Sequence, residues 1–276
     1  MRELSGKVAV VTGAASGIGR AMAVRFAAEG MSLMLADVDP GGLAETAAMA
    51  GEGRVLTQIT DVSDASAVQH LAARSFGEFG AVHVLCNNAG VFQGGHMWTR
   101  TPEDFAWTLG VNLWGVLHGV NAFVRRMIEQ DTEGHIVNTV SVAGLFAAPY
   151  MAGYSVSKHA AFAASLSLAQ DLALTGAKLR VTALCPGAVR TGINRSERVR
   201  PADLMVGRTR DDYDAQGIID AVLENGLAPE DVAGMVVRAI HEERFLLLTH
   251  PGYAKGLRDQ VDALLAGGLP QLPDYE

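Results

Sequence analysis

Short apolar runs alternate with helix-like segments along most of this chain, and this alternation restricts the possible folds more than any other feature. Residues 8–11 read Val-Ala-Val-Val, whereas Ile18, Met22 and Phe26 recur every four residues within 17–30. Strands that are apolar on both sides and separated by helices predict a parallel sheet covered on both faces, with right-handed crossovers. The fold class that we expect is α/β, a doubly wound parallel sheet of about seven strands with helices on both faces.

The same alternation gives the order of the expected elements. We expect strands at residues 8–11, 31–36, 54–60, 82–87, 135–141, 178–184 and 245–249. We expect helices at residues 17–30, 43–50, 64–79, 105–130 and 154–174, and one that starts near Pro229. No internal repeat interrupts the series, so residues 1–276 are expected to form a single domain.

Composition narrows the class of protein. The 276 residues include 22 Lys and Arg against 30 Asp and Glu, which gives a formal net charge of −8. Hydrophobic types make up 49% and charged types 19%, so the chain has enough apolar material to fold. The negative charge disfavours nucleic acid as a partner, because phosphate binding needs a basic face. Cys86 and Cys185 are too few for a disulfide framework, which favours a reducing, cytoplasmic location.

One uncharged stretch, residues 136–157, is long enough to span a bilayer. It also contains Asn138, Ser141, Pro149 and Ser155, which a span would have to bury in lipid. We interpret it as a buried strand, a loop and the start of a helix, and we expect no membrane partner. The N-terminus has no basic cluster ahead of an apolar run, so we also expect no signal peptide.

A glycine-rich segment follows the first expected strand and opens the first expected helix. It reads Thr12, Gly13, Ala14, Ala15, Ser16, Gly17, Ile18, Gly19. Gly13 permits a tight turn, Gly17 lets the backbone approach a pyrophosphate, and Gly19 lets the helix lie close to the strand. The helix N-terminus offers free N–H groups and a positive dipole end to the anion. The context predicts a Rossmann-type dinucleotide site, whereas the glycines alone are also compatible with a plain strand-to-helix turn.

Asp37 lies eighteen residues beyond Gly19, at the end of the second expected strand. A carboxylate there accepts hydrogen bonds from the adenosine ribose hydroxyls and repels a 2′-phosphate. No Arg or Lys occurs from Thr12 to Ile18, and residue 38 is valine, so no cation is placed to receive such a phosphate. The sequence therefore predicts NAD rather than NADP as the cofactor. A strand-end cap is the alternative for Asp37.

Tyr154 and Lys158 are four residues apart on an expected helix, so they share one face. A tyrosine has an ordinary pKa of about 10, and a nearby ammonium favours the phenolate, so we expect Lys158 to lower the pKa of Tyr154. Tyr154 is then able to exchange a proton with an alcohol or carbonyl oxygen. Ser141, thirteen residues upstream, is expected to hydrogen-bond the same oxygen. The alternative is an ordinary helix face with a half-buried Tyr and a snorkelling Lys.

Together these motifs resemble the short-chain dehydrogenase/reductase family, in its single-domain, NAD-preferring branch. The resemblance covers residues 7–249, and the matching positions occur in order and at ordinary spacings. They are Thr12-Gly13-x-x-x-Gly17-x-Gly19, Asp61-Val62, Asn87-Asn88-Ala89-Gly90, Asn112, Ser141, Tyr154-x-x-x-Lys158 and Pro186-Gly187-x-Val189-x-Thr191.

The resemblance implies catalytic roles. Tyr154 is the general acid/base, Lys158 also hydrogen-bonds the nicotinamide ribose, and Ser141 orients the substrate oxygen. Asn112 holds a water in a proton relay; a helix-kink residue that bonds the backbone is a compatible alternative. The implied reaction is hydride transfer between NAD and a secondary alcohol or ketone.

The resemblance also implies cofactor contacts beyond the glycine-rich turn. Asp61 and Val62 place the adenine ring. Three residues, Asn88, Ala89 and Gly90, line the cofactor near the ribose, while Asn87 ties strands together. The nicotinamide and its amide are covered by Pro186, Gly187, Val189 and Thr191.

Candidate wall residues of the substrate pocket are mostly apolar, which favours a hydrophobic alcohol or ketone. They are Val91, Phe92, Gln93, Val142, Ala143, Leu145, Ala148, Tyr150, Met151, Ala188, Ile193 and Met205. Residues 190–226 interrupt the strand–helix alternation, and we expect them to form a substrate lid, with a solvated surface excursion as the alternative. A second alternative is that the arginines of 190–210 reach into the pocket and bind an anion. Residues 251–276 are expected to form a C-terminal tail.

Two other functions compete with this prediction. One is an NADP-linked carbonyl or 3-ketoacyl reductase, which Asp37 disfavours. The other is a non-catalytic nicotinamide-binding regulatory protein, although such proteins tend to lose the Tyr or the Lys.

The histidines show no metal-site spacing, so we expect no metal. We expect Trp98, Trp107 and Trp114 to serve packing or an interface, and the resemblance implies a homotetramer.

Overall fold

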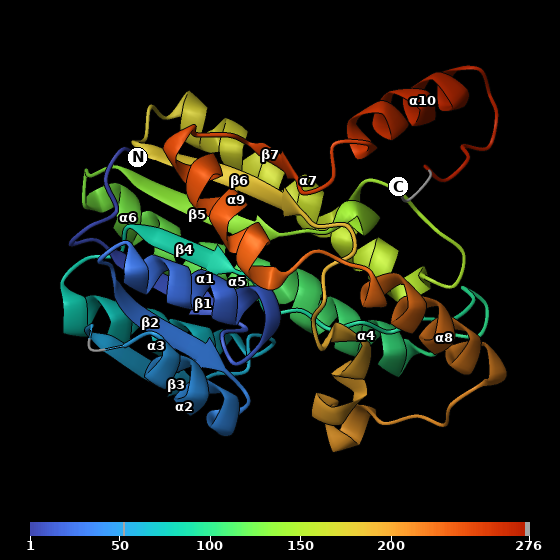
Figure 1. Cartoon of the computed structure of the whole chain (residues 1–276), viewed down its shortest axis with the longest axis horizontal. Coiled ribbons are helices and arrows are strands. Elements are labelled where there is room, and N and C mark those ends of the chain that lie inside the picture. Colours follow the sequence, from blue (N-terminus) through green and yellow to red (C-terminus); the bar gives the residue numbers. More distant parts are fainter. Residues whose placement is uncertain (52, 274–276) are drawn as a thin grey trace.

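The computed structural model describes residues 1–51 and 53–273, and its centre is a seven-stranded sheet. Every strand pair is parallel, and the order across the sheet is β3-β2-β1-β4-β5-β6-β7 (Figure 1). The strands are β1 (Val8–Thr12), β2 (Ser32–Asp37), β3 (Val55–Ile59), β4 (Val84–Asn87), β5 (Gly134–Thr139), β6 (Leu179–Cys185) and β7 (Leu246–Leu248). The prediction of seven parallel strands is confirmed.

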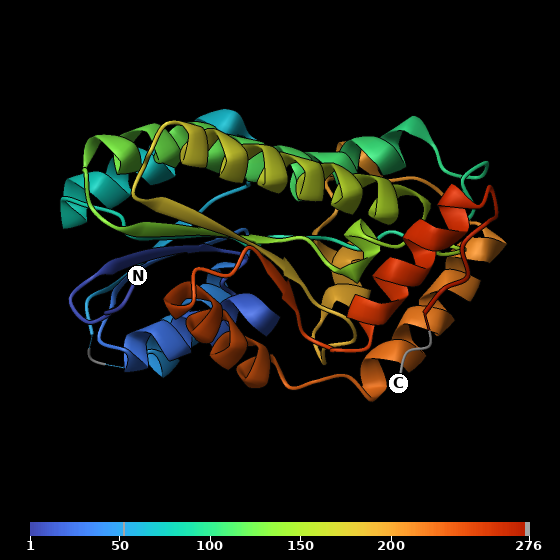
Figure 2. The same cartoon turned by 90° about the horizontal axis from the view of Figure 1, so that it is seen from above.

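Helices cover both faces of the sheet (Figure 2). They are α1 (Gly17–Ala28), α2 (Pro40–Met49), α3 (Ala65–Phe79), α4 (Pro102–Leu109), α5 (Gly115–Gly119), α6 (Arg125–Glu129), α7 (Ala152–Leu174), α8 (Arg210–Glu224), α9 (Pro229–His241) and α10 (Tyr253–Leu265). Two π-helical segments, Gly110–Trp114 and Val120–Val124, join α4, α5 and α6 into the single long helix that the sequence predicted. Among the described residues, no helix is long and apolar enough to cross a membrane.

Two apolar cores form because consecutive strand residues point to opposite faces. Val11 of β1 belongs to the core that also contains Phe26 of α1 and Val236 of α9. Val10, the preceding residue, belongs to the core that contains Leu71 of α3 and Phe123 of the long helix. This is why the β strands are apolar on both sides, the feature that predicted a parallel, doubly covered sheet.

The strand order changes direction between β1 and β4, because β2 lies on one side of β1 and β4 on the other. Crevices form outside the carboxyl ends of strands at such a switch point. β1 ends at Thr12, directly before the glycine-rich turn, and β4 ends at Asn87, directly before Asn88-Ala89-Gly90. The topology therefore brings these two motifs to one edge of the sheet.

Two helices, α8 and α10, were missed by the sequence analysis. The α8 helix lies inside residues 190–226, which were expected to lack a strand but were not assigned a helix. Its start has a capping box, Thr209 with Asp212, and this signal was available in the sequence. The α10 helix lies in the C-terminal tail; residues 274–276 of that tail are outside the described residues.

Buried amides tie strand ends together beneath the crevice. Asn87 Nδ2 donates to Asn138 Oδ1 at 2.9 Å, linking β4 to β5. Gly119 of the long helix packs directly on this pair, since a Cβ at Gly119 would lie 2.0 Å from Asn87 Oδ1. The strand-tying role expected of Asn87 agrees with this geometry.

We expect Gly119→Ala to lower the free energy of unfolding by about 1–3 kcal/mol, because the added methyl overpacks the buried amide pair. Gly77→Ala in α3 is the matched control, since a Cβ there would meet nothing within 4 Å. The control should be neutral or gain up to about 1 kcal/mol from helix propensity. Urea unfolding of both variants provides the measurement, and equal effects would contradict the packing assignment.

Candidate active site

A cavity of about 550 Å³ lies at the carboxyl ends of the strands and extends from the glycine-rich turn to α8 and residues 272–273. Almost all of the sequence-predicted site residues line it. They are Gly13, Ser16, Gly17, Ile18, Asp37, Asp61, Val62, Asn88, Ala89, Gly90, Ser141, Tyr154, Lys158, Pro186, Gly187, Val189 and Thr191. Gly19 and Asn112 lie behind this lining.

The glycine-rich turn is shaped to receive an anion. Gly13 and Gly17 have φ of +66° and +54°, a region that favours glycine. A Cβ at Gly19 would lie 2.0 Å from the Gly13 carbonyl oxygen, so Gly19 serves close packing. Ser16 starts α1 without making a side-chain capping bond, whereas Asp39 caps α2 and Asp64 caps α3. The first N–H groups of α1 are therefore left for a ligand.

The Asp37 carboxylate lies beside this turn. Its Oδ2 accepts from Ala15 N at 2.9 Å, and its Oδ1 accepts from Asp39 N at 3.1 Å. These contacts fit the strand-end cap that was the alternative interpretation of Asp37, and a role toward a ribose stays a prediction. Among the described residues that line the cavity, the cations are Lys158 and Arg198.

A hydroxyl at the end of β1 holds the Asn88-Ala89-Gly90 turn in place. Thr12 Oγ1 accepts from Asn88 N at 3.0 Å and from Ala89 N at 3.2 Å. Asn88 Nδ2 donates to the Thr12 carbonyl oxygen at 3.0 Å, and Thr139 Oγ1 donates to Asn88 Oδ1 at 3.0 Å. These bonds fix the ends of β1, β4 and β5 relative to one another. Asp61, which also lines the cavity, accepts at Oδ1 from the backbone N and the hydroxyl of Ser63.

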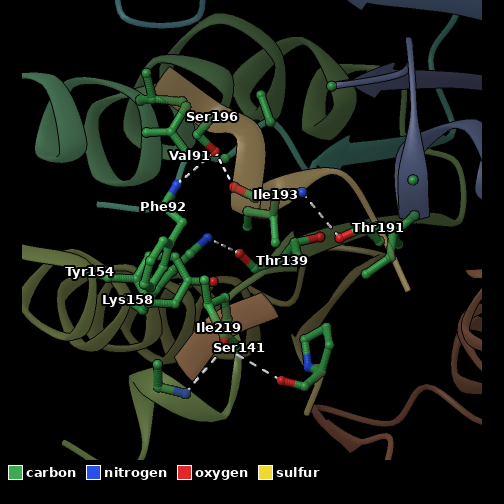
Figure 3. A pocket seen from close by; sticks show the side chains of 18 of the residues that line it. Val91, Phe92, Thr139, Ser141, Tyr154, Lys158, Thr191, Ile193, Ser196 and Ile219 are labelled. Carbon is green, nitrogen blue, oxygen red and sulfur yellow. Dashed lines mark hydrogen bonds between the residues drawn. The ribbon is translucent and has the colours of Figure 1, made fainter. Parts of the chain in front are cut away.

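Tyr154 and Lys158 point into the cavity from the first turns of α7 (Figure 3). Both side chains are buried, with Tyr154 9% and Lys158 2% exposed. Lys158 Nζ donates to the Thr139 carbonyl oxygen at 2.9 Å and lies 5.7 Å from the centroid of the Tyr154 ring. The Tyr154 ring also packs edge-on against Phe92, at 5.3 Å between centroids.

Burial controls the pKa values of this pair. It lowers the pKa of Lys158 to about 8, because a low-dielectric surrounding disfavours the ammonium. Burial also raises the pKa of Tyr154 above its ordinary value, and a hydrogen bond with Ser141 offsets part of this rise. The expectation that Lys158 would lower the pKa of Tyr154 is therefore wrong for the protein without cofactor. The cost of burying the Tyr154 phenolate outweighs its attraction to the Lys158 ammonium, because burial disfavours the charged form of Lys158 as well.

Ser141 lies two residues beyond the end of β5, rather than at the end of the strand as expected. Its φ is +99°, an uncommon conformation for a residue with a side chain. Ser141 Oγ accepts from Ala143 N at 3.2 Å and lies 3.4 Å from the Pro186 carbonyl oxygen. The hydroxyl is thus held between the two loops that follow β5 and β6.

Asn112 lies in the first π-helical segment, fully buried. Its Oδ1 accepts from Val91 N at 2.8 Å, and its Nδ2 donates to the Val91 carbonyl oxygen at 2.9 Å and to Ser157 Oγ at 3.0 Å. These contacts fit the alternative interpretation of Asn112 as a helix-kink residue that bonds the backbone. A role in a water relay stays a prediction.

The apolar walls agree with the sequence prediction at most positions. Residues that line the cavity as expected are Val91, Phe92, Val142, Ala143, Ala148, Tyr150, Met151, Ala188 and Ile193. Three predictions were wrong. Leu145 lies in an apolar core with Val140, Met205 is 56% exposed, and Gln93 is buried and donates to the Gly94 carbonyl oxygen.

Several wall residues were missed. Ile219, Val222 and Leu223 of α8 line the cavity, and their spacing is that of one helical face, a signal present in the sequence. Trp107 also lines the cavity, although it was expected to serve only packing or an interface. Leu272, near the chain end, had no sequence signal because nothing in the pattern indicates that the tail folds back.

Buried ion pairs hold α8 over the cavity. Arg100, with its side chain 2% exposed, donates to Thr209 Oγ1 at 2.6 Å and pairs with Asp211 at 3.3 Å and with Asp212. Arg200 is also buried, but it pairs with Asp104 at 2.8 Å instead of presenting its charge to the cavity.

Fold and cavity together define a dinucleotide-binding α/β protein with a buried Tyr–Lys pair. A family model for the short chain dehydrogenases matches residues 7–201, and the chain belongs to this family of oxidoreductases.

Similar proteins extend the match to the whole chain. The crystal structure of a short chain dehydrogenase/reductase from Burkholderia phymatum in complex with NAD is 43% identical, with a TM-score of 0.96 and 100% of both chains covered. The 1-deoxy-11-beta-hydroxypentalenate dehydrogenase of Streptomyces arenae is 36% identical over 262 residues, 93% of this chain and 86% of that protein. The CLA biosynthesis dehydrogenase/reductase of Lactiplantibacillus plantarum is 30% identical over 280 residues, 99% of this chain and 98% of that protein.

The raised pKa of Tyr154 is directly measurable. We expect the difference in ultraviolet absorbance between the wild type and Tyr154→Phe to show the Tyr154 phenolate appearing at a higher pH in the folded protein than in the unfolded chain, because burial disfavours its charge. In urea the same tyrosine should titrate near its ordinary value of about 10. A folded-state titration below that of the unfolded chain would mean that the Lys158 charge, rather than burial, dominates.

Proposed function

We propose that this protein is an NAD-dependent oxidoreductase that interconverts a hydrophobic secondary alcohol and its ketone. The observation that carries this proposal is the buried Tyr154–Lys158 pair in the same cavity as the glycine-rich turn and Asp37. The relation to a short-chain dehydrogenase crystallised with NAD supports the choice of cofactor.

The glycine-rich turn and Asp37 would hold the adenosine half of the cofactor. The N-terminus of α1, which has no side-chain cap, would bind the pyrophosphate at Ser16, Gly17 and Ile18, and Asp37 would accept hydrogen bonds from the ribose diol. Asp61 and Val62 flank the adenine. This donor set fits a dinucleotide, because the first N–H groups of α1 are free of a side-chain cap. Gly13 and Gly17 also let the turn pack closely on its neighbours, since a Cβ would lie 2.7 Å from Ala89 Cα at Gly13 and 3.1 Å from Thr191 Cγ2 at Gly17.

The nicotinamide half would lie toward α7. Asn88, Ala89 and Gly90 would line its ribose, and Lys158 would donate to the ribose hydroxyls. The loop after β6 would cover its ring and amide through Pro186, Gly187, Val189 and Thr191, all of which line the cavity. When bound, NAD supplies the hydride acceptor or donor.

The chemistry of this chain is proton transfer at the carbinol oxygen. Tyr154 takes the hydroxyl proton during oxidation and returns it during reduction, while Ser141 orients the oxygen. Asn112, through a water, connects the site to solvent. Because the pKa of Tyr154 is raised, its base form is scarce at neutral pH, so oxidation should speed up as the pH rises. Reduction uses the protonated phenol and should be favoured at neutral pH.

The substrate is hydrophobic because the wall opposite Tyr154 is apolar. Phe92, Ile219 and Leu223 pack around Tyr154 as one buried cluster. The similar Streptomyces arenae protein is a 1-deoxy-11-beta-hydroxypentalenate dehydrogenase, and the hydroxyl group in this substrate name supports an alcohol as the substrate class. A screen of cyclic secondary alcohols, with and without a carboxylate, against small open-chain hydroxy acids tests the class, with NAD reduction as readout.

Residues 190–226 act as the substrate lid, anchored near the middle of the segment by the ion pairs of Arg100 with Asp211 and Asp212. The protein works as a homotetramer in the cytoplasm, with residues 1–276 as one domain. Exposed apolar side chains support an interface on the long helix and on α7, since Trp114 is 51%, Val156 42% and Leu166 40% exposed. Gel filtration tests the assembly.

Tyr154→Phe should lower turnover by about 10²–10⁴-fold, the usual contribution of a general acid or base, and leave NAD affinity nearly unchanged. Tyr150→Phe is the matched control, because Tyr150 lines the same cavity without a catalytic role in this proposal. Steady-state rates and the NAD dissociation constant separate the two effects. Near-wild-type turnover of Tyr154→Phe would refute the assignment.

Asp37 should set the cofactor preference. We expect NADP to bind at least about tenfold more weakly than NAD, because the carboxylate repels the 2′-phosphate. Asp37→Ser should bring the NAD and NADP dissociation constants closer together, mainly by weakening the binding of NAD. Titration calorimetry with both cofactors gives the ratio directly, and tighter binding of NADP by the wild type would favour the NADP-linked reductase instead.

A further inference from the structure

The diphosphate bridge of a dinucleotide carries two negative charges, and the glycine-rich turn that receives it contains no cation. The nearest arginine on α1, Arg20, already has hydrogen-bond and ion-pair partners. It donates to the Ala15 carbonyl oxygen at 2.5 Å and pairs with Glu45 at 2.8 Å. A cationic side chain that binds the diphosphate in addition to the N–H groups of α1 therefore has to come from another element.

The 3₁₀ turn Ile193–Val199, at the start of the expected lid, approaches the glycine-rich turn through Thr191 and Gly192. A Cβ at Gly17 would lie 3.1 Å from Thr191 Cγ2, so Thr191 packs on the turn itself. A Cβ at Gly192 would lie 3.2 Å from Arg195 Nη2, so the Arg195 guanidinium packs against the next residue. Among the described residues, that guanidinium has no hydrogen-bond or ion-pair partner.

Arg198 lies on the same 3₁₀ turn and borders two cavities. One is the cavity of Tyr154; the other is a neighbouring groove that also contains Arg195. The two share Ser16, Gly17, Thr191 and Gly192, which are residues at the phosphate-binding turn. Arg198 is exposed, and the bond that its guanidinium makes is from Nη1 to the Arg195 carbonyl oxygen at 3.1 Å.

Acidic groups in the groove do not neutralise these two arginines. Asp220, Glu224 and Glu230 line it as well. Asp220 Oδ1 accepts from Asn194 Nδ2 at 2.7 Å and from Gln216 Nε2 at 2.8 Å. No ion pair joins any of the three to Arg195 or Arg198 within the described residues.

We propose that Arg195 and Arg198, on the turn Ile193–Val199 beside the N-terminus of α1, bind the diphosphate of the dinucleotide together with the first N–H groups of α1. Guanidinium groups bond phosphate oxygens with charge assistance and in a forked geometry, which makes arginine suited to this role. The inference rests on the proposed NAD function and adds to it a second binding surface, carried by the lid.

The position of these arginines couples cofactor binding to the substrate wall. Ser196 lies between them and accepts from Phe92 N at 3.0 Å, while Phe92 packs on the Tyr154 ring. Ile193, at the start of the same turn, belongs to the apolar cluster around Tyr154. Drawing Arg195 and Arg198 onto a diphosphate therefore fixes the turn that supports the wall beside the catalytic tyrosine.

Calorimetric titration of the full chain tests the proposal with three probes: NAD, ADP-ribose, which has the diphosphate, and adenosine, which lacks it. In Arg195→Ala/Arg198→Ala, NAD and ADP-ribose should bind about tenfold or more weakly at low ionic strength, with adenosine unchanged. Added salt should weaken ADP-ribose binding more steeply in the wild type than in the variant. Arg208→Ala is the control, since Arg208 lies on the same segment over the Tyr213 ring and should have no effect.

NAD affinity of the double variant within twofold of the wild type would overturn the proposal, as would an equal loss for adenosine. Should the alanine variant fail to fold, Arg195→Gln/Arg198→Gln takes its place, judged by the same ratios. Failure of the wild type to bind NAD at all would instead refute the proposed function. Thermolysin digestion adds a second readout. In the wild type, ADP-ribose but not adenosine should protect residues 193–208 from cleavage. In the double variant, ADP-ribose should no longer protect them.

Discussion

The hydrogen bond from Lys158 Nζ to the Thr139 carbonyl oxygen, 2.9 Å long, is the contact on which the site depends. It joins α7 to the end of β5, and it satisfies an ammonium that is only 2% exposed. A buried cation without a partner would be strongly destabilising. The bond therefore fixes the rotation of α7, and with it the direction in which Tyr154 points.

Parallel topology explains why the other groups meet at that place. The carboxyl ends of β1, β4, β5 and β6 reach one edge of the sheet, and each ends in a turn that lines the cavity. Thr12 Oγ1 locks two of these turns together, so the site is held by strand ends rather than by a flexible loop. The segment that covers it, with α8, is fastened separately through Arg100.

Local patterns were sufficient to predict the sheet, because apolar runs on both strand faces and helical periodicity are short-range signals. They also predicted which motifs gather at the cavity, since parallel strands carry them to one edge. They failed where the outcome depends on burial or on distant contacts. The direction of the Tyr154 pKa shift was wrong because sequence shows a neighbouring charge but not the depth at which both groups are buried. Likewise, Leu272 reaches the cavity only through the path of the folded tail.

Isotope transfer tests the central claim most directly. The enzyme is incubated with NAD and a cyclic secondary alcohol that carries deuterium on its carbinol carbon, and the reduced cofactor is examined by mass spectrometry. The account predicts that the deuterium moves to the nicotinamide ring without exchange with solvent, at a rate that rises with pH. Ketone formation with no deuterium in the cofactor would contradict it.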